Sequence, residues 1–422
     1  MKRYSNPKRD FWEQITTRSG LSNESVKEAV SKVFDSLKEK GDQALFEYAK
    51  LFDGVDLSTL SCTVRDIEIN ESLAEAIQLA KRNIEAFHRN QKLNESPVET
   101  MKGIKCWREA RAIEKVGLYI PGGSAPLFST LLMLAIPAKI AECKEIVVCT
   151  PPSKDGGLNE VIEFTANLVG IDKVYMVGGA QAIAAMTLGT EFIPKVNKIF
   201  GPGNQYVTQA KELAQTMGVS IDMPAGPSEV LVIADDSANP EYIAADLLSQ
   251  AEHGSDSQVV LLSTSDKVLE KTEQAIEKQL KDLDRIDQVK ASLENSFSVS
   301  FASLEECMNF SNFYAPEHLI LNTKEDEKLC DLISNAGSVF VGKYSCESAG
   351  DYASGTNHTL PTNAYSKSYS GVSLDSFMKR ITFQKLSEEG IKSIGPSIKF
   401  MAEAEGLMAH KNAVSIRLKD LT

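Results

Sequence analysis

The chain has 422 residues, of which 42% are hydrophobic and 24% charged, and its 45 basic against 58 acidic residues give a net charge of −13. This length predicts more than one domain, and the composition is typical of a globular protein. The negative charge argues against nucleic acid or an anionic membrane as a partner, because both carry charge of the same sign.

Membrane and targeting segments are not expected. No apolar run approaches the roughly 18 residues that a transmembrane helix needs, and no apolar segment follows the basic N-terminus as it would in a signal peptide. The 7 cysteines are widely spaced, which fits neither a disulfide framework nor a metal-binding Cys-x-x-Cys motif. We therefore expect reduced thiols and a cytoplasmic protein.

Two amphipathic helices are predicted near the N-terminus. Apolar residues recur at helical spacing in residues 23–39, which Gly41 closes, and again in residues 72–90. Both helices are expected to be scaffold. His88 follows Phe87 in a charged stretch, so we expect a surface histidine without a chemical role.

From Lys115 onward, short apolar strands alternate with helices. Strands are expected at residues 115–120, 145–149, 173–177, 198–200, 229–234, 257–263, 319–321 and 338–341. The longer helices are expected at residues 127–143, 158–169, 240–252 and 268–283, and the residues after Leu374 are expected to be helical again. This alternation predicts the α/β class, with parallel sheets covered by helices on both faces.

Two such α/β units follow one another along the chain. We predict two Rossmann-like parallel-sheet domains, each incomplete and related by duplication, with small helical N- and C-terminal extensions. The expected boundaries are an N-terminal extension at 1–14, a discontinuous first α/β domain at 15–118 with 230–372, a second α/β domain at 119–229 and a tail domain at 373–422.

Three glycine turns each follow an expected strand: Pro121-Gly122-Gly123, Gly178-Gly179-Ala180-Gln181 and Gly201-Pro202-Gly203-Asn204. Ligands of open α/β sheets bind at the carboxyl ends of the strands, and glycine there lets a phosphate group approach backbone N–H groups. None of the three matches Gly-x-Gly-x-x-Gly, so the usual dinucleotide fingerprint is absent. A plain tight turn remains the alternative for any one of them.

The stretch from Glu347 to Pro361 is rich in Gly, Ser, Asn and Asp, which predicts a loop rather than a helix or strand. It carries Asp351, Asn357 and His358, whose side chains can bind a metal or a substrate. Long loops in compact domains are either functional or disordered. Because an apolar strand precedes this one, we interpret it as functional.

Two groups of side chains are candidates for chemistry. Gln250 and His253 lie three residues apart at a helix end and face the same way; with Asp351 and His410 they would form a nitrogen and oxygen set suited to Zn²⁺, Mn²⁺ or a similar ion. The alternative is a helix-end hydrogen-bond site.

Glu317 and His318 are the second group, and a carboxylate beside an imidazole suits two separate proton transfers. Adjacent strand residues point to opposite faces, so both serve one site only if the backbone is irregular, which Pro316 favours. A purely structural loop pair is the alternative.

At this point the sequence closely resembles the histidinol dehydrogenase family, nearly from end to end. The resemblance rests on eight ordered motifs: Val116-Gly-Leu-Tyr-Ile-Pro-Gly-Gly123, Val177-Gly-Gly-Ala-Gln181, Phe200-Gly-Pro-Gly-Asn204, Ala225-Gly-Pro-Ser-Glu-Val230, Leu248-Ser-Gln-Ala-Glu-His253, Ala315-Pro-Glu-His-Leu319, Ala349-Gly-Asp-Tyr-Ala-Ser-Gly-Thr-Asn-His358 and Glu405-Gly-Leu-Met-Ala-His410.

The resemblance implies oxidation of L-histidinol to L-histidine through L-histidinal with NAD, the last steps of histidine biosynthesis, in a homodimer with one Zn²⁺ per subunit. It implies that the first α/β domain holds the metal and catalytic residues, that the second lies on the NAD side, and that the tail domain reaches the partner's site. The residues it implies are Gln250, His253, Asp351 and His410 for zinc, Glu317 and His318 for acid–base catalysis, Tyr119, Gln181 and Asn204 for NAD, and Ser228, Gln250, His253, His318, Asp351, His358, Glu405 and His410 for the substrate.

Three other functions fit parts of the sequence. A related zinc- and NAD-dependent dehydrogenase would oxidise another primary alcohol, such as a sulfonated diol. A zinc hydrolase would use the same metal ligands to activate water, but it would not need the three glycine turns. A non-catalytic sensor of NAD or metal leaves the Glu317–His318 pair unexplained.

Overall fold

The structure is a computed structural model that describes residues 1–18, 24–93, 95–122, 126–224 and 226–421. The chain divides into a first unit, Met1–Gln91 with Ile113–Phe377, and a second unit, Lys92–Ala112 with Met378–Thr422. Asn23 of the first predicted helix, Gly123 of the first glycine turn and Ala225 of one family motif lie outside the described residues.

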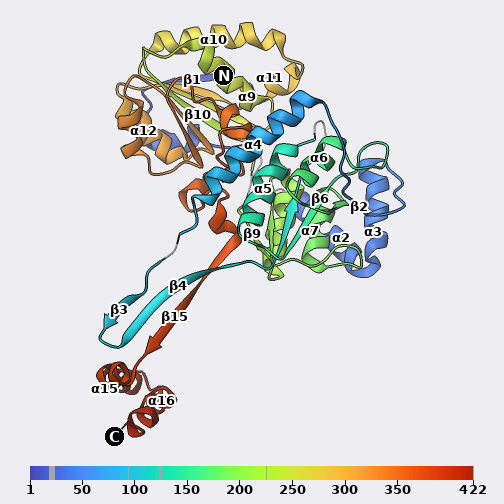
Figure 1. The fold of residues 1–422 in the computed structure, drawn as a ribbon. Helices are drawn as coiled ribbons and strands as arrows, with labels where there is room; N and C mark the ends of the chain where they lie inside the picture. The colour runs from blue at the N-terminus through green and yellow to red at the C-terminus, as the bar shows by residue number, and fades with distance from the viewer. Residues whose placement is uncertain (19–23, 94, 123–125, 225, 422) are drawn as a thin grey trace. The chain divides into compact units, whose positions relative to one another are not determined.

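Figure 1 shows the elements in chain order. The strands are β1 (Lys2–Ser5), β2 (Ser61–Thr63), β3 (Val98–Met101), β4 (Ile104–Ala112), β5 (Lys115–Tyr119), β6 (Glu145–Thr150), β7 (Lys173–Met176), β8 (Lys198–Phe200), β9 (Ser220–Ile221), β10 (Glu229–Ala234), β11 (Gln258–Ser263), β12 (Phe297–Ser300), β13 (His318–Asn322), β14 (Ser338–Val341) and β15 (Met378–Leu386). The α-helices are α1 (Trp12–Ile15), α2 (Glu24–Lys40), α3 (Asp42–Tyr48), α4 (Glu71–Arg89), α5 (Phe128–Ile140), α6 (Glu160–Leu168), α7 (Gly179–Leu188), α8 (Gln205–Thr216), α9 (Pro240–Ala251), α10 (Asp266–Gln279), α11 (Ile286–Glu294), α12 (Leu304–Tyr314), α13 (Asp326–Leu329), α14 (Glu347–Tyr352), α15 (Glu388–Ala404) and α16 (Met408–Lys419).

Two six-stranded sheets form the centre of the first unit. Sheet A has the order β1-β12-β11-β10-β13-β14, and sheet B has the order β2-β7-β6-β5-β8-β9. Neighbouring strands are parallel, except that β2 runs antiparallel to β7. The strands β5 to β9 and β10 to β14 follow the same arrangement, so one topology occurs twice, each time with an added edge strand. The predicted pair of Rossmann-like parallel sheets is confirmed.

Sheet A is covered on both faces. Val230 and Val232 of β10 belong to one apolar core with residues of α9 and α10, whereas Leu231 and Ile233 belong to another with Trp12 and α12. This division follows from the two-residue period of a strand. All six residues of β10 are buried, as expected for the central strand of a parallel sheet between two helical layers.

Sheet B shares a core with α2, α7 and α8. Helix α5 is buried along nearly its whole length, including Pro137, and packs against α4 and α6. Helices α2 and α3 and strand β2 come from residues 15–118, which we expected in the first α/β domain, yet they pack with sheet B. The local pattern could show that α2 is amphipathic, but not which sheet its apolar face covers.

The second unit contains an antiparallel sheet, β15-β4-β3, followed by α15 and α16, which pack against each other. Strand β15 corrects our expectation that the residues after Leu374 are helical. Its central residues Ile381-Thr382-Phe383 are β-branched or aromatic, and the strand pairs along its whole length with β4, a partner more than 250 residues away in the chain.

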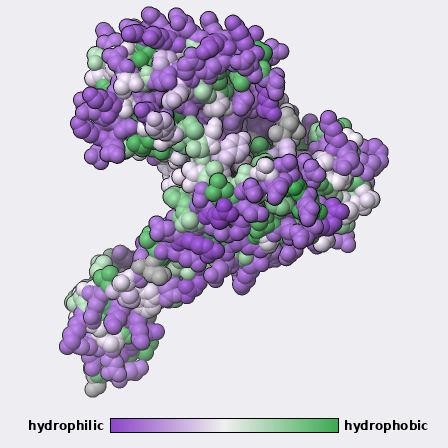
Figure 2. All heavy atoms as spheres, turned by 45° about the horizontal axis from the view of Figure 1, so that its top comes forward, coloured by the Kyte–Doolittle hydropathy of each residue, from purple (hydrophilic) through white to green (hydrophobic). Residues whose placement is uncertain are grey.

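The surface agrees with the composition. Figure 2 shows mostly hydrophilic side chains on the visible face, with hydrophobic ones scattered among them. No helix of the described residues has both the length and the apolarity needed to cross a membrane.

Candidate active site

The site is built from opposite ends of the two sheets. In sheet B, Tyr119 ends β5 and Gly201 follows the neighbouring β8, so the expected cofactor turns lie at the carboxyl ends where open sheets bind ligands. In sheet A, Glu229 begins β10 and His318 begins the neighbouring β13. The expected acid–base residues therefore lie at the amino ends of their sheet.

A cavity of about 570 Å³ joins the two regions, a volume typical of small-ligand sites. Its walls combine the turn Gly201–Asn204 with predicted catalytic, metal and substrate residues, namely Ser228, His253, Glu317, His318, Asp351 and His358. The fold thus brings these residues into one enclosure, although they come from chain segments up to 157 residues apart.

The peptide groups of Glu229 hold both expected acid–base residues. The Glu229 N–H donates to Glu317 Oε2 at 2.8 Å, and the Glu229 carbonyl oxygen lies 3.0 Å from His318 Nδ1. The chain before β13 is irregular, because Ala315 has a φ of 56° in the left-handed region. Through this irregularity Glu317 and His318, although adjacent in sequence, serve one site.

The side chain of Glu229 is fixed in turn by Arg18. The guanidinium binds both carboxylate oxygens, at 2.5 and 3.0 Å, and donates to the Tyr314 carbonyl oxygen at 2.8 Å. It also lies over the Tyr314 ring, 3.9 Å from its centroid. A buried carboxylate needs such pairing, so the N-terminal segment anchors the start of β10 beside Glu317 and His318.

The surroundings fix which nitrogen of His318 carries the proton. Nδ1 lies 3.0 Å from the Glu229 carbonyl oxygen, which can only accept, so the neutral ring carries its hydrogen there and leaves the lone pair of Nε2 free, while the Gln250 amide nitrogen 3.1 Å from Nδ1 has two other acceptors for its hydrogens. Nε2 is buried without a hydrogen-bond partner among the described residues. Loss of water around the ring lowers the pKa of His318 to about 3.

Glu317 has the opposite shift. Burial raises its pKa well above the usual value, and the charges of Glu229 and Asp351 add to this effect. A carboxylate with a raised pKa is a stronger base when it is ionised. Both shifts have the same main cause, because burial disfavours the charged form of a carboxyl and of an imidazole alike.

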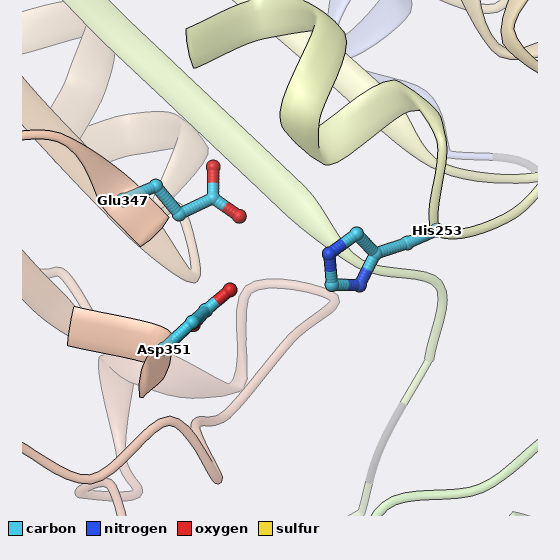
Figure 3. A group of neighbouring side chains, drawn as sticks. All are labelled: His253, Glu347 and Asp351. Carbon is cyan, nitrogen blue, oxygen red and sulfur yellow. The ribbon is translucent and has the colours of Figure 1, made fainter. Parts of the chain in front are cut away.

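Helix α14 corrects our expectation of a loop from Glu347 to Pro361, because its first six residues are helical. Glu347 and Asp351 lie four residues apart and so share one helix face. Figure 3 shows both carboxylates directed toward His253, and one ligand atom from each of the three residues lies within 4.8 Å of the others. This group has the donor chemistry of a site for Zn²⁺ or a similar ion.

Gln250, in the last turn of α9, borders this group. With its amide nitrogen toward the acceptors, it donates to Glu347 Oε1 at 2.8 Å and to the Glu229 carbonyl oxygen at 3.2 Å. The orientation leaves its carbonyl oxygen as the atom available to a metal. Glu347 is 1% exposed, and its other oxygen is buried without a partner among the described residues.

His358 is held by both ring nitrogens. Its Nδ1 lies 2.9 Å from the Asp351 carbonyl oxygen, and its Nε2 lies 3.2 Å from Thr130 Oγ1. Burial lowers the pKa of His358 to about 4. The ring is therefore neutral at physiological pH and forms part of the cavity wall.

His88 is fully buried, which corrects our expectation of a surface histidine. Its Nδ1–H donates to the Ile84 carbonyl oxygen at 2.8 Å, and its Nε2 lies 3.4 Å from Asn357 Nδ2. Asn357 also donates to Met133 O at 2.7 Å. Asn357 therefore links His88 of α4 and Met133 of α5 to the chain beside His358.

The expected cofactor residues are linked through their turns. Tyr119 Oη accepts a hydrogen bond from Gly179 N–H at 3.1 Å, and Asn204 caps α8 by accepting from the N–H groups of Tyr206 and Val207. Asn204 is exposed and lines the cavity, whereas Tyr119 and Gln181 are each 5% exposed and lie behind the wall.

Glu405 and His410 are not brought to this cavity within the first unit, because they belong to the second unit, near and on α16. Three further residues at the site escaped our sequence analysis: Arg18, Glu229 and Glu347. The spacing of Glu347 and Asp351 would have revealed Glu347, had the stretch been interpreted as a helix. The pairing of Arg18 with Glu229 spans 211 residues and has no local signal.

Comparison with known proteins gives a consistent picture. The histidinol dehydrogenase family model matches residues 16–418. A histidinol dehydrogenase of Bacteroides thetaiotaomicron is 53% identical over 426 residues, with all of both chains covered. A chloroplastic histidinol dehydrogenase of Arabidopsis thaliana is 52% identical, covering 97% of this chain and 89% of its own.

Solved structures agree. A crystal structure of histidinol dehydrogenase from Elizabethkingia anophelis matches with a TM-score of 0.97 and 56% identity, over 100% of this chain and 98% of its own. An acetylating aldehyde dehydrogenase from Geobacillus thermoglucosidasius, at 14% identity and a TM-score of 0.50, shares the fold alone.

Proposed function

Since the chain belongs to the histidinol dehydrogenase family, we propose that it oxidises L-histidinol to L-histidine through L-histidinal, with NAD as the electron acceptor. The observation that supports this proposal most directly is the cavity, which joins the Glu317–His318 pair to the glycine turns of sheet B. Family membership favours histidinol over another primary alcohol as the substrate. A zinc hydrolase is disfavoured, because it would not need the glycine turns.

We propose that Gln250, His253 and Asp351 hold a zinc ion. The residues fit such an ion, because His253 and Asp351 belong to a convergent donor group and the buried oxygen of Glu347 beside them lacks a partner among the described residues. When bound, the metal supplies a template that orients the amine and imidazole of the substrate. His410 is proposed as the fourth ligand.

His318 is proposed as the base of the first oxidation. Its Nε2 carries the free lone pair of the neutral ring, so this atom can take the hydroxyl proton of the alcohol. Glu317 is proposed as the base of the second oxidation, in which the aldehyde must add water before it can be oxidised again. Each proton transfer of this kind contributes roughly 10²–10⁴ to the rate.

NAD, when bound, accepts the hydride of each step. We propose that Tyr119, Gln181 and Asn204 position it, because Tyr119 ends β5, Gln181 lies in the first turn of α7 after β7, and Asn204 caps α8 after β8. Ser228 and His358 are proposed substrate contacts, since both line the cavity.

We propose that the active form is a homodimer in which the second unit supplies Glu405 and His410 to the partner's site. Helix α16 contains no buried residue among those described. The second unit exposes Phe400, Met401, Met408 and Ile416, with exposed fractions between 54% and 74%. A second copy of the chain would cover these side chains. The proposed compartment is the cytoplasm, which agrees with seven free thiols.

Spectrophotometric detection of NADH tests this proposal. We expect two NADH for each histidinol oxidised, loss of activity after removal of metal by a chelator, and its return with Zn²⁺. Histidinal supplied as substrate should give one NADH. Absence of NADH from both substrates, with zinc present, would refute the proposed function.

A further inference from the structure

Beneath the turn Gly201–Asn204 lies a buried ion pair that has no place in the chemistry described above. It joins Lys211 of α8 to Asp222, which follows β9, and the two side chains are 2% and 1% exposed. Both residues line the cavity wall. A buried charge of each sign loses its hydration on folding, and an apolar pair of similar size is often as stable or more stable. Stability alone therefore does not explain the pair.

The two charges hold the main chain of the turn. Lys211 Nζ donates to the Gly201 carbonyl oxygen at 3.0 Å, and the Gly201 N–H donates to Asp222 Oδ2 at 2.8 Å. The second oxygen, Asp222 Oδ1, accepts from the Met223 N–H at 2.7 Å. Both backbone polar groups of Gly201 are thus bound by the ion pair, and charge-assisted hydrogen bonds of this kind are the strong ones.

The position so fixed is tightly constrained. Gly201 has a φ of 132°, and a Cβ atom there would lie 2.2 Å from the Tyr119 carbonyl oxygen. The turn therefore presses against the end of β5, while the Tyr119 hydroxyl accepts from Gly179 of the next turn. A shift of Gly201 would move Asn204 directly, and it would remove the support of Tyr119.

We propose that Lys211 and Asp222 are positioning residues for the coenzyme: they hold the Gly201–Asn204 turn in the conformation that binds NAD. This inference rests on the proposed function, because it assigns the turn to NAD. The pair acts on coenzyme binding rather than on the chemical steps, since neither side chain contacts Glu317 or His318 in the contacts described.

Steady-state kinetics with saturating histidinol test the inference. Asp222→Asn removes the charge while keeping one acceptor, and Lys211→Met removes the bond to the Gly201 carbonyl oxygen. Each should raise the KM for NAD about tenfold or more, while kcat at saturating NAD and the KM for histidinol change less than about twofold. Calorimetric titration with NAD should show the same loss of affinity.

The double variant Lys211→Met/Asp222→Asn separates positioning from stability. Lys211→Met leaves a lone buried carboxylate and should lower Tm, whereas the double variant carries no buried charge and should recover Tm without recovering NAD affinity. Glu163→Gln is the control, because it breaks the Arg65–Glu163 pair, whose carboxylate is also 2% exposed, although Arg65 is 72% exposed, and neither residue lines the cavity. It should leave the KM for NAD unchanged.

A folded double variant or Asp222→Asn variant whose KM for NAD stays within twofold of the wild type would overturn the inference. An equal loss in kcat would do so as well, because it would mean a general disturbance of the site. Failure of the proposed function is distinguishable, since the wild type itself would then form no NADH from histidinol.

Discussion

At the scale of single residues, the adjacent groups Glu317 and His318 are both held by the backbone of Glu229. Its N–H binds the carboxylate and its carbonyl oxygen receives the imidazole Nδ1–H. The sequence could propose the pair for two proton transfers, but adjacent residues on a regular strand point to opposite faces, so only the structure shows that both side chains reach one cavity.

The proposed assignment of one oxidation to His318 and the other to Glu317 leads to a prediction. Glu317→Gln keeps the shape and one acceptor but removes the base, so it should slow the oxidation of histidinal by about 10²-fold or more while affecting the oxidation of histidinol far less. Single-turnover NADH formation from each substrate measures this. His318→Asn is the matched variant, and it should mainly slow the first oxidation. Equal losses in both half-reactions for Glu317→Gln would contradict the role proposed for it.

Local chemistry made much of the site predictable. Gln250 and His253 stand at a helix end, and the helix α9 ends at Ala251 as expected from its apolar pattern and from Gly254. Arg18 and Glu347 were missed for different reasons. Arg18 acts through a partner that only the tertiary structure brings near, whereas Glu347 was hidden by the glycine- and serine-rich composition of its surroundings.

At the scale of elements, local composition predicted the wrong secondary structure for the segment that forms α14. Residues 347–352 form the helix α14, although the glycine- and serine-rich stretch to which they belong predicted a loop. Gly350 of this helix packs against the Phe340 ring, where a Cβ would lie 2.7 Å from the nearest ring carbon. By contrast, the elements with continuous apolar patterns, such as β10, β11 and α4, lie within one or two residues of the predicted bounds.

The buried histidine of α4 gives a prediction about pH. Burial lowers the pKa of His88 from its usual 6.5, so below that pH the unfolded chain binds a proton that the folded chain does not. Its contribution to stability is therefore present above about pH 6.5 and is lost as pH falls, by up to about 1.4 kcal/mol per pH unit.

The variant His88→Gln, which does not titrate but can still accept a hydrogen bond from Asn357, should show a weaker loss of stability between about pH 7 and pH 5. Urea unfolding of both proteins across this range measures the difference. The other buried histidines are common to both, so their contributions cancel. Unfolding curves that shift in parallel with pH would show that His88 takes up its proton in the folded state.

At the scale of the whole molecule, the proposed exchange of second units between subunits can be tested by complementation. We expect Glu317→Gln and His410→Ala each to block the formation of histidine at every site of their own homodimer, Glu317→Gln by slowing the second oxidation, so histidine formation is the activity to measure. In a mixed dimer, one site combines an intact first unit with an intact second unit from the partner. Co-expression in equal amounts should then restore about a quarter of wild-type activity, because half of the dimers are mixed and half of their sites are complete.

Activity in the mixture no higher than in either variant alone would place His410 in the site of its own chain. Cys62→Ser, a change on β2 remote from the expected site, serves as an active control partner. In an equal mixture with Glu317→Gln it should give about half of wild-type activity, because half of the sites keep an intact first unit.

The repeated topology has a consequence for descent. The proposed coenzyme residues lie at the carboxyl ends of strands in sheet B and the proposed acid–base residues at the amino ends of strands in sheet A, so by this proposal the two halves share no functional position. If the halves arose by doubling of one gene, selection had no shared functional position to preserve between the copies. Their common origin would then remain visible in the order of the strands, while the similarity of the two amino-acid sequences would be lost. This would account for the weak signal of duplication in the sequence.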